Sequence, residues 1–393
     1  MKFSVPTNWQ PELIQALNVE FADEVYGKLR DDPIGGCRNS YSLPFISRHN
    51  ARAYISQLHK KRIGFNYVLN SICLNNYEWT KSGQKQIRDF LAWLVEIGVD
   101  SVTVSIPYLL EMIKKNYPSL KVVVSTMAGV DSLGKVKYWE SLGADEITLS
   151  SIRVNRNFPL LKKIKQEAKC KLRLIANECC LYQCPFRPYH AAIGSHGTQS
   201  QHYLKGFLID YPNLSCNYKK LLSPFELIRS PWIRPEDLQH YEAIGIERIK
   251  LIDRAMSTPV LISIYNAYVN RSYEGNLFNL FLSADKTLIL EKPKLLHRLK
   301  YFFRPFTVNI LKLIKLRELI IQDVFYIENR DLDDFILHFI NNDCSLTLCE
   351  DCRYCYKIAD RVVKINQDKR SCLIKKYEKY LDELISGGMF RYP

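Results

Sequence analysis

A unit that recurs along the first two thirds of the chain constrains its fold more than any other feature. Each copy has an amphipathic helical stretch, a turn with a glycine, and a run rich in Val, Ile, Leu and Thr. The clearest copies surround Gly64, Gly98, Gly143 and Gly245. Glycine directly after a helix is typical of a left-handed C-cap, and the runs that follow have the composition of buried parallel strands. The alternation predicts an α/β fold with helices packed on a parallel sheet.

Counting the β-rich runs gives eight expected strands, which predicts a closed (β/α)8 TIM-type barrel over residues 21–272. The expected strands are 24–29, 64–70, 101–106, 121–126, 146–151, 171–177, 226–230 and 248–253. Stretches such as 82–97 and 132–142 are the expected helices between them. An open doubly wound sheet is the alternative, but no G-x-G-x-x-G follows the first strand. Residues 1–20 are expected to be a short helical lead-in, and residues 273–393 a mostly helical, cysteine-rich extension.

Polar side chains follow several of these strands, at the end of the barrel where such folds place their chemistry. Asn70 and Asn177 end two strands and are expected to orient a substrate. Arg38, Arg234 and Arg254 lie in the loops after other strands, and forked guanidinium groups bind carboxylate or phosphate well. The alternatives are that each Asn caps the next helix and that each Arg forms a salt bridge between loops.

The most reactive segment is KLRLIANECCLYQCPFRPYHAAIGSH, residues 171–196. It begins as a strand and continues as a loop with Cys179, Cys180 and Cys184, followed by Arg187 and His190. Cys180 and Cys184 have a spacing that suits two corners of an iron–sulfur cluster. The radical-SAM motif C-x3-C-x2-C is not completed, because Arg187 stands at its third position. We expect Arg187 and His190 to act on a substrate beside the thiols, although a single histidine is more often structural.

A second cysteine set lies in the expected extension, with the spacing C-x4-C-x2-C-x2-C. Its members are Cys344, Cys349, Cys352 and Cys355. C-x2-C-x2-C is the spacing by which one loop wraps an iron–sulfur cluster, whereas zinc sites more often use two separated knuckles. Iron–sulfur is the first expectation and zinc the alternative, with Cys372 as another candidate for the fourth ligand. The simplest alternative is that these are four free thiols at the start of a helix, with no bound metal.

The composition of the chain indicates the compartment in which we expect the protein. The chain has twelve cysteines, no apolar N-terminal leader and no apolar run of the ~20 residues that span a bilayer. We therefore expect a cytoplasmic protein whose thiols stay reduced and bind metal rather than form disulfides. The formal net charge of +14 favours an anionic partner such as RNA, a nucleotide or an acidic substrate. A basic surface without a specific ligand is the alternative.

Taken together, these segments resemble the peptidase U32 family. The resemblance is carried by NECCLYQCPFRPYH, GFNYVLNSICLNN, VDSVTVSIPYL, ADEITLSSIRVNR and SPWIRPEDLQHYEAIGIERIKLIDR, and covers roughly residues 21–270. The cysteine-rich tail resembles that of part of the family. The family was named for collagenase-like peptidases. Its better understood relatives are iron–sulfur proteins that support oxygen-independent hydroxylation of a tRNA or ribosomal RNA base or of the ubiquinone ring.

The resemblance implies a barrel in which four cysteines hold a [4Fe-4S] cluster, with prephenate as a candidate oxygen donor. By position, Cys180 and Cys184 match the paired cysteines of the family and Cys216 matches a later single one. The fourth ligand is either Cys179 or Cys37. The chain departs from the commoner pattern E-x-F-x2-G-[SA]-[LIVM]-C, so the substrate is not carried over.

We therefore expect an iron–sulfur enzyme that hydroxylates, or modifies by related redox chemistry, an RNA base, a quinone, or another small molecule or peptide. The tail cysteines are the expected site of a second cluster, and a paired U32-family subunit is a candidate partner. The sequence does not identify the electron donor. One alternative is a U32-type peptidase, which needs a metal-bound water or an activated nucleophile, although no H-E-x-x-H or G-x-S-x-G is present. Another is a non-catalytic subunit that carries a cluster within a modification complex.

Overall fold

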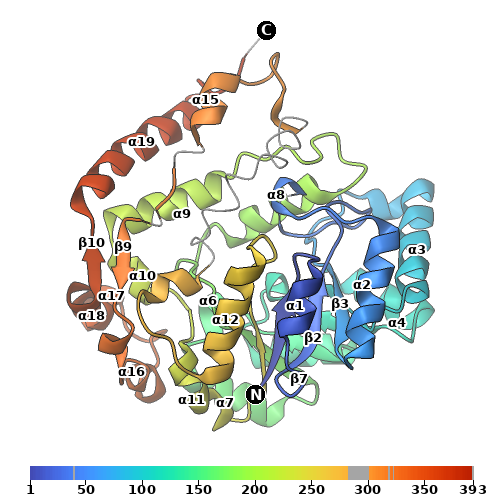
Figure 1. Cartoon of the computed structure of the whole chain (residues 1–393), viewed down its shortest axis with the longest axis horizontal. Coiled ribbons are helices and arrows are strands. Elements are labelled where there is room, and N and C mark those ends of the chain that lie inside the picture. Colours follow the sequence, from blue (N-terminus) through green and yellow to red (C-terminus); the bar gives the residue numbers. More distant parts are fainter. Residues whose placement is uncertain (39, 282–300, 317–318, 322, 392–393) are drawn as a thin grey trace.

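Eight parallel strands close into a barrel, and helices cover its outside (Figure 1). The computed structural model describes residues 1–38, 40–281, 301–316, 319–321 and 323–391. The strands follow the chain order around the barrel, and the last pairs with the first through Ser4 and Lys250. They are β1 (Lys2–Pro6), β2 (Ala22–Gly27), β3 (Gly64–Leu69), β4 (Ser101–Val104), β5 (Lys121–Val124), β6 (Glu146–Thr148), β7 (Lys171–Ile175) and β8 (Arg248–Lys250). The predicted (β/α)8 barrel is confirmed.

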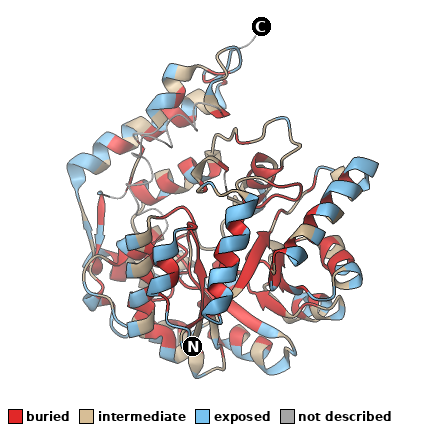
Figure 2. Cartoon of the chain, turned by 45° about the vertical axis from the view of Figure 1, so that its right-hand side comes forward, coloured by how far each residue is buried: buried red, intermediate tan, exposed pale blue. Residues whose placement is uncertain are grey.

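The helices of the barrel lie between the strands and turn their exposed faces to solvent (Figure 2). They are α1 (Pro11–Ala16), α2 (Arg48–Lys60), α3 (Lys81–Glu96), α4 (Pro107–Asn116), α5 (Leu133–Ser141), α6 (Ser151–Val154), α7 (Phe158–Glu167), α8 (Arg187–Thr198), α9 (Tyr211–Leu222), α10 (Phe225–Arg229), α11 (Leu238–Glu242) and α12 (Thr258–Asn270). The predicted helices at 82–97 and 132–142 correspond to α3 and α5. In the part of the chain that the structure describes, no helix is long and apolar enough to cross a membrane.

The hydrophobic core lies between the strands and the surrounding helices. Side chains alternate along each strand, so Val25, Val102 and Leu174 point outward into this apolar layer and are fully buried. The residues beside them point into the barrel, where Arg173 donates hydrogen bonds to Glu24 at 2.7 Å and to Glu146 at 2.7 Å. The barrel axis is therefore filled by a buried ion network instead of apolar side chains.

Two sequence expectations were wrong. Residues 1–20 are not a lead-in outside the barrel, because Lys2–Pro6 form β1 and pair with both β2 and β8. Residues 226–230 are not a strand, because Phe225–Arg229 form helix α10 after Pro224. The eight-strand count is right only because one strand was missed and one helix was read as a strand.

The C-terminal extension packs against the side of the barrel. Its helix α19 lies beside α9 (Figure 1), and α18 packs on α10. Arg234 joins the two parts, with its buried guanidinium 3.0 Å from both Asn329 Oδ1 and Asp333 Oδ1. The described elements of the extension are α15 (Ile310–Lys315), β9 (Phe325–Ile327), α16 (Leu337–Asn341), α17 (Cys349–Cys352), α18 (Tyr354–Val362), β10 (Val363–Ile365) and α19 (Gln367–Ile385). Strands β9 and β10 pair antiparallel.

Candidate active site at the mouth of the barrel

Cysteines from two distant segments come together at the C-terminal end of the strands. Cys180 and Cys184 lie in the loop that follows β7, and Cys216 lies on α9. Burial raises the pKa of the Cys180 and Cys184 thiols, and the nearby sulfur of Cys216 raises both further. The three cysteines that the family resemblance grouped are therefore neighbours in space.

A buried lysine lies among these thiols. Lys220 is 3% exposed and follows Cys216 by one helical turn, so both side chains leave the same face of α9. Its ammonium group donates a hydrogen bond of 2.5 Å to the carbonyl oxygen of Cys179. Burial acts to lower the pKa of Lys220, but the neighbouring Cys179, Cys216 and Cys180 raise it above its ordinary value. The ammonium group therefore stays charged and favours thiolate around it.

Arg187 adds a second positive charge and is held by a carboxylate. Its guanidinium donates to Glu178 Oε1 at 2.5 Å and to Cys180 Sγ at 3.4 Å. Glu178 also accepts a hydrogen bond from the hydroxyl group of Ser151. Arg187 is thus fixed beside a candidate ligand sulfur, and its charge is already shared with Glu178. Arg187 is therefore better placed to stabilise the thiolates than to bind a substrate by itself.

Cys37 comes from the loop after β2 and packs on α8. Its sulfur lies 3.1 Å from the carbonyl oxygen of Asn70, 3.6 Å from that of Ala191 and 3.8 Å from Ser195 Oγ. Asn70 also accepts a hydrogen bond from the backbone N–H of Cys37 through its side chain, at 3.2 Å. Arg187, Ala191 and Ser195 follow one another at helical spacing on α8, so Cys37 lies along the face that begins at Arg187. The predicted Asn70 is a positioning residue for this cysteine.

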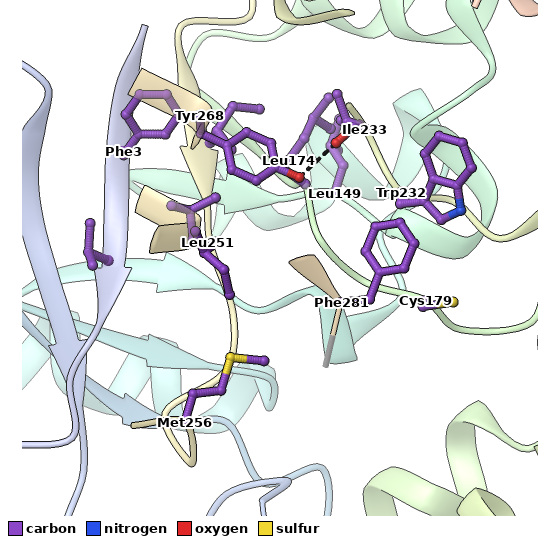
Figure 3. Close-up of a cluster of buried hydrophobic side chains, with 14 of the residues drawn as sticks. Phe3, Leu149, Leu174, Cys179, Trp232, Ile233, Leu251, Met256, Tyr268 and Phe281 are labelled. Carbon is purple, nitrogen blue, oxygen red and sulfur yellow. Dashed lines mark hydrogen bonds between the residues drawn. The ribbon is translucent and has the colours of Figure 1, made fainter. Parts of the chain in front are cut away.

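Cys179 lies in the same loop, and its thiol has both apolar and charged neighbours: burial raises its pKa, Lys220 acts against this shift, and Cys216 adds to it. Its side chain is 8% exposed and belongs to the cluster that contains Trp232 and Phe281 (Figure 3). Its sulfur lies 3.6 Å from Ser230 Oγ. Of the two candidates for the fourth barrel ligand, Cys37 faces the polar mouth and Cys179 faces the core.

Two buried cations at the mouth have no counter-ion among the described residues. Arg254 is 6% exposed, forms no salt bridge there, and its Nη1 atom has no hydrogen-bond partner. Lys250 is 8% exposed, and its ammonium nitrogen lies 3.7 Å from the centre of the Tyr26 ring. Burial, together with Arg173 and Arg254, lowers the pKa of Lys250 to about 7, although Glu24 and Glu146 act against the shift. Arg38 is near Arg254 but is paired with Asp253 at 3.2 Å. A group of cations with too few carboxylates is suited to an anionic ligand.

Three predicted residues have other roles. Asn177 is fully buried and joins the ends of β7 and β8, since its side chain accepts from the Ile252 N–H at 2.8 Å and donates to Leu280 O at 3.0 Å. Arg234 lies between the barrel and the extension, so its salt bridges leave it no part in a substrate clamp. His190 pairs with Asp210 at 3.2 Å and stays partly exposed near the mouth.

The sequence interpretation missed Glu178, Lys220 and Lys250. Glu178 directly precedes the cysteine pair, so its place in the site had a local signal. Lys250 alternates with outward-facing residues on β8, and this pattern marks an inward-facing cation. Lys220 had no signal, because it is one of several lysines on amphipathic helices.

The mouth brings together several thiols and two cations. Cys180, Cys184, Cys216 and Cys37 offer four thiols, and Lys220 and Arg187 offset the negative charge that thiolates bring. Among the residues that the structure describes, no group of three or more His, Cys, Asp or Glu side chains is arranged to hold a metal ion. A cubane cluster does not require its ligands to meet at one metal ion, because each thiolate binds a separate iron. The residues present therefore fit such a cluster in type and charge.

The four tail cysteines are not at the mouth. All four line a cavity between the barrel and the extension. Cys372, the other candidate ligand, is exposed on α19 and does not line it.

Comparison with known proteins places the barrel in a family. A family model described as Peptidase family U32 matches residues 16–176. An uncharacterized protease of Methanocaldococcus jannaschii is 31% identical over 306 residues, which cover 78% of this chain and 79% of the relative. A solved U32 peptidase structure is 21% identical, with a TM-score of 0.48, over 64% of this chain and 93% of that one. A cyclic maltosyl-maltose hydrolase of Arthrobacter globiformis is 11% identical, with a TM-score of 0.32, over 48% of this chain and 60% of that one.

The family model and the relative agree with the resemblance in the sequence. The relative spans most of both chains at an identity above 30%, and the matched residues 16–176 include strands β2 to β7 of the barrel. The chain belongs to peptidase family U32.

Proposed function

We propose that the chain is an iron–sulfur oxidoreductase that modifies an anionic organic substrate at the mouth of the barrel without dioxygen. The observation that carries the proposal is the meeting of Cys180, Cys184 and Cys216 at the end of the strands, with the ammonium group of Lys220 beside Cys180 and Cys216. Cysteines in a reducing compartment that converge from distant segments more often bind metal than serve as separate thiols. Cys37 is the fourth ligand in this proposal, since it faces the mouth.

The protein's own groups have separate tasks in this scheme. A [4Fe-4S] cluster, when bound, supplies one-electron chemistry at a thiolate-held iron. Lys220 and Arg187 stabilise the thiolates, and Glu178 and Asn70 hold Arg187 and Cys37 in place. Arg254 and Arg38 bind a carboxylate or phosphate of the substrate or of the oxygen donor, for which prephenate, a dicarboxylate, is the candidate that the family resemblance suggests. The pair of His190 and Asp210 can hold a proton at Nε2 beside the mouth.

The test is iron and sulfide content after anaerobic purification of the full chain. The variants are C180A, C184A and C216A, with C372A as the control because Cys372 is an exposed thiol outside both cysteine sets. The proposal expects each of the three variants to lose about four irons per chain, the content of one cubane, while the control keeps them. Full iron content in all three variants would overturn the ligand assignment. Products formed after anaerobic expression, with and without the protein, would then identify the substrate.

A peptidase is the second candidate, and the names of the family and of the archaeal relative favour it over the first. One contact supports it: Cys352 Sγ lies 3.7 Å from His338 Nε2 in the tail cavity. Cysteine peptidases use such a pair, because the imidazole accepts the thiol proton. The test is peptide hydrolysis by metal-free protein. Loss of hydrolysis in both C352A and H338A would support a peptidase, and retained hydrolysis in either variant would exclude this dyad.

A cluster-carrying subunit without activity of its own remains the third reading of the mouth. It predicts that the purified chain has the spectra of a cluster but turns over no substrate until a second U32-type subunit is added. The same anaerobic preparation distinguishes it from the first proposal.

A further inference from the structure

The tail cysteines belong to a site that the barrel and the extension build together. A cavity of about 220 Å³ lies between them, and its wall includes all four cysteines of the C-x4-C-x2-C-x2-C segment. The barrel contributes the other wall, through Arg153, Arg156, Tyr182 and Arg229. The site therefore does not exist in the extension alone.

The local fold explains why four cysteines so close in sequence surround one space. Cys349–Cys352 form the short helix α17, which ends at Arg353 in the left-handed conformation, with φ of 50°. Helix α18 begins directly afterwards and holds Cys355 in its first turn. All four cysteines line the same cavity, so the turn between α17 and α18 brings their side chains to one space.

Two arginines of the barrel face these thiols. Arg229 donates to Cys349 Sγ at 3.4 Å. Arg156 is 7% exposed and is held by the carbonyl oxygens of Ile228 at 2.6 Å and Trp232 at 3.0 Å. It forms no salt bridge with a carboxylate in the described chain; burial lowers its pKa, and Cys355, Tyr241, Asp237 and Cys344 act against that shift. A buried guanidinium without a counter-ion is costly unless an anion binds beside it.

We propose that Cys344, Cys349, Cys352 and Cys355 hold an iron–sulfur cluster in this cavity, with Arg156 and Arg229 as its counter-charges. The spacing suits a cluster, since each thiolate of a C-x2-C-x2-C loop reaches a separate iron. The cavity is also far larger than the ~30 Å³ that one water occupies in the liquid. Four thiolates around one zinc ion would leave no space between them, so the size of the cavity favours a cluster over zinc. A cluster held by four thiolates is anionic and supplies the negative charge that Arg156 lacks.

The cluster also joins the two parts of the chain. Its ligands come from the extension and its counter-charges from the barrel, so binding stabilises the packing of α18 on α10 by mass action. Tyr182, which lines the same cavity, lies in the loop between Cys180 and Cys184. The tail site and the mouth are therefore adjacent, but their ligands are separate.

The test is anaerobic reconstitution of the full chain with ferrous iron and sulfide. The tail variant is C349S/C352S and the control is C372S. We expect the wild type and the control to bind about eight irons per chain, and the tail variant about four. A second readout is limited proteolysis, in which iron and sulfide should slow cleavage between the barrel and the extension of the wild type but not of the tail variant. Circular dichroism checks that the tail variant is folded.

R156M gives an independent measurement, because it keeps all four thiols and removes a counter-charge. It should lose the tail cluster faster than the wild type when a chelator is added. The proposal is overturned if the folded tail variant keeps the iron and sulfide of the wild type, or if the wild type carries one zinc ion that the tail variant lacks. The C180A variant separates this result from the proposed function, since it should lose only the irons of the mouth.

Discussion

The thiol of Cys37 donates a hydrogen bond of 3.1 Å to the carbonyl oxygen of Asn70, and the side chain of Asn70 accepts one from the Cys37 backbone N–H at 3.2 Å. The two residues lie in loops after different strands of the barrel, β2 and β3. The contact fixes the Cys37 sulfur at the mouth, beside the α8 face that starts at Arg187. Cys179, the other candidate for the fourth ligand, instead belongs to the apolar cluster that contains Trp232 and Phe281 (Figure 3).

This difference predicts opposite effects of two similar substitutions. C37A should lose the irons of the mouth, because it removes a ligand, whereas C179A should keep them. C179A should instead cost about 1 kcal/mol of stability, since it removes a small buried side chain from a packed cluster. Iron content and urea unfolding of the two purified variants check the prediction. Iron loss in C179A together with full iron in C37A would reverse the assignment.

Asp237 makes stability depend on pH. Burial raises the pKa of its carboxyl group to about 7, Arg234 and Arg156 act against the shift, and Glu236 and Asp333 add to it. Its Oδ2 atom has no hydrogen-bond partner among the described residues. Between pH 4 and 7 the folded protein binds a proton that the unfolded chain has released, so the free energy of unfolding should fall as the pH rises through this window. The loss is on the order of 4 kcal/mol for a shift of this size.

The matched variants are D237N, which should remove most of this slope, and D89N, which should leave it unchanged because Asp89 is in an exposed pair with Lys85. Unfolding midpoints in urea from pH 4 to pH 8 measure the slope. Equal slopes in the wild type and D237N would show that Asp237 is not the group that titrates.

The fold could be predicted from the sequence because its signal is local and repeated. A helix, a glycine and a β-rich run recur, and each copy is one unit of the barrel. Strand β1 was missed because no helix–glycine unit precedes it at the start of the chain. The segment at 226–230 was read as a strand because a short apolar run does not by itself distinguish a buried strand from one turn or two of a helix.

Only those parts of the site whose residues are close in the sequence could be predicted. Cys180 and Cys184 share one loop, so their pairing is visible in the sequence. Lys220 and Arg254 reach the mouth from α9 and from the end of β8, and only closure of the barrel brings them there. The same holds for the tail, where the cysteine spacing is local but Arg156 comes from a loop almost two hundred residues earlier.

Arg173 should be the most sensitive position inside the barrel. Its guanidinium is fully buried and pairs with Glu24 and Glu146. Burial acts to raise the pKa of Glu24, but Arg173 outweighs it and holds that pKa at about 2. R173M leaves the buried Glu24 without a cationic partner and Glu146 with Arg248 alone, and should cost ~3–5 kcal/mol of unfolding free energy. R271M, on an exposed pair with Glu242, should cost less than ~1 kcal/mol.

The double variant R173M/E24Q provides the internal check on Arg173. It removes the charge of Glu24, which R173M leaves without a cationic partner, and should recover part of the loss. Urea unfolding at pH 7 measures all three proteins, and a double variant no more stable than R173M would mean that lost packing, not charge, causes the effect.

Arg254 should show the opposite behaviour, since it is buried without a partner. R254M removes an uncompensated charge and should raise the stability of the ligand-free protein by ~1–3 kcal/mol. A ligand that binds only the folded state raises the unfolding temperature in proportion to the logarithm of its concentration, so malonate or phosphate should stabilise the wild type and not R254M. R52M, on an exposed pair with Glu96, should behave as the wild type in both measurements. Thermal unfolding with increasing concentrations of each anion makes the comparison, with sodium chloride at matched ionic strength as the reference. An R254M protein that is less stable than the wild type, and that malonate still stabilises, would mean that Arg254 supports the barrel wall instead of binding an anion.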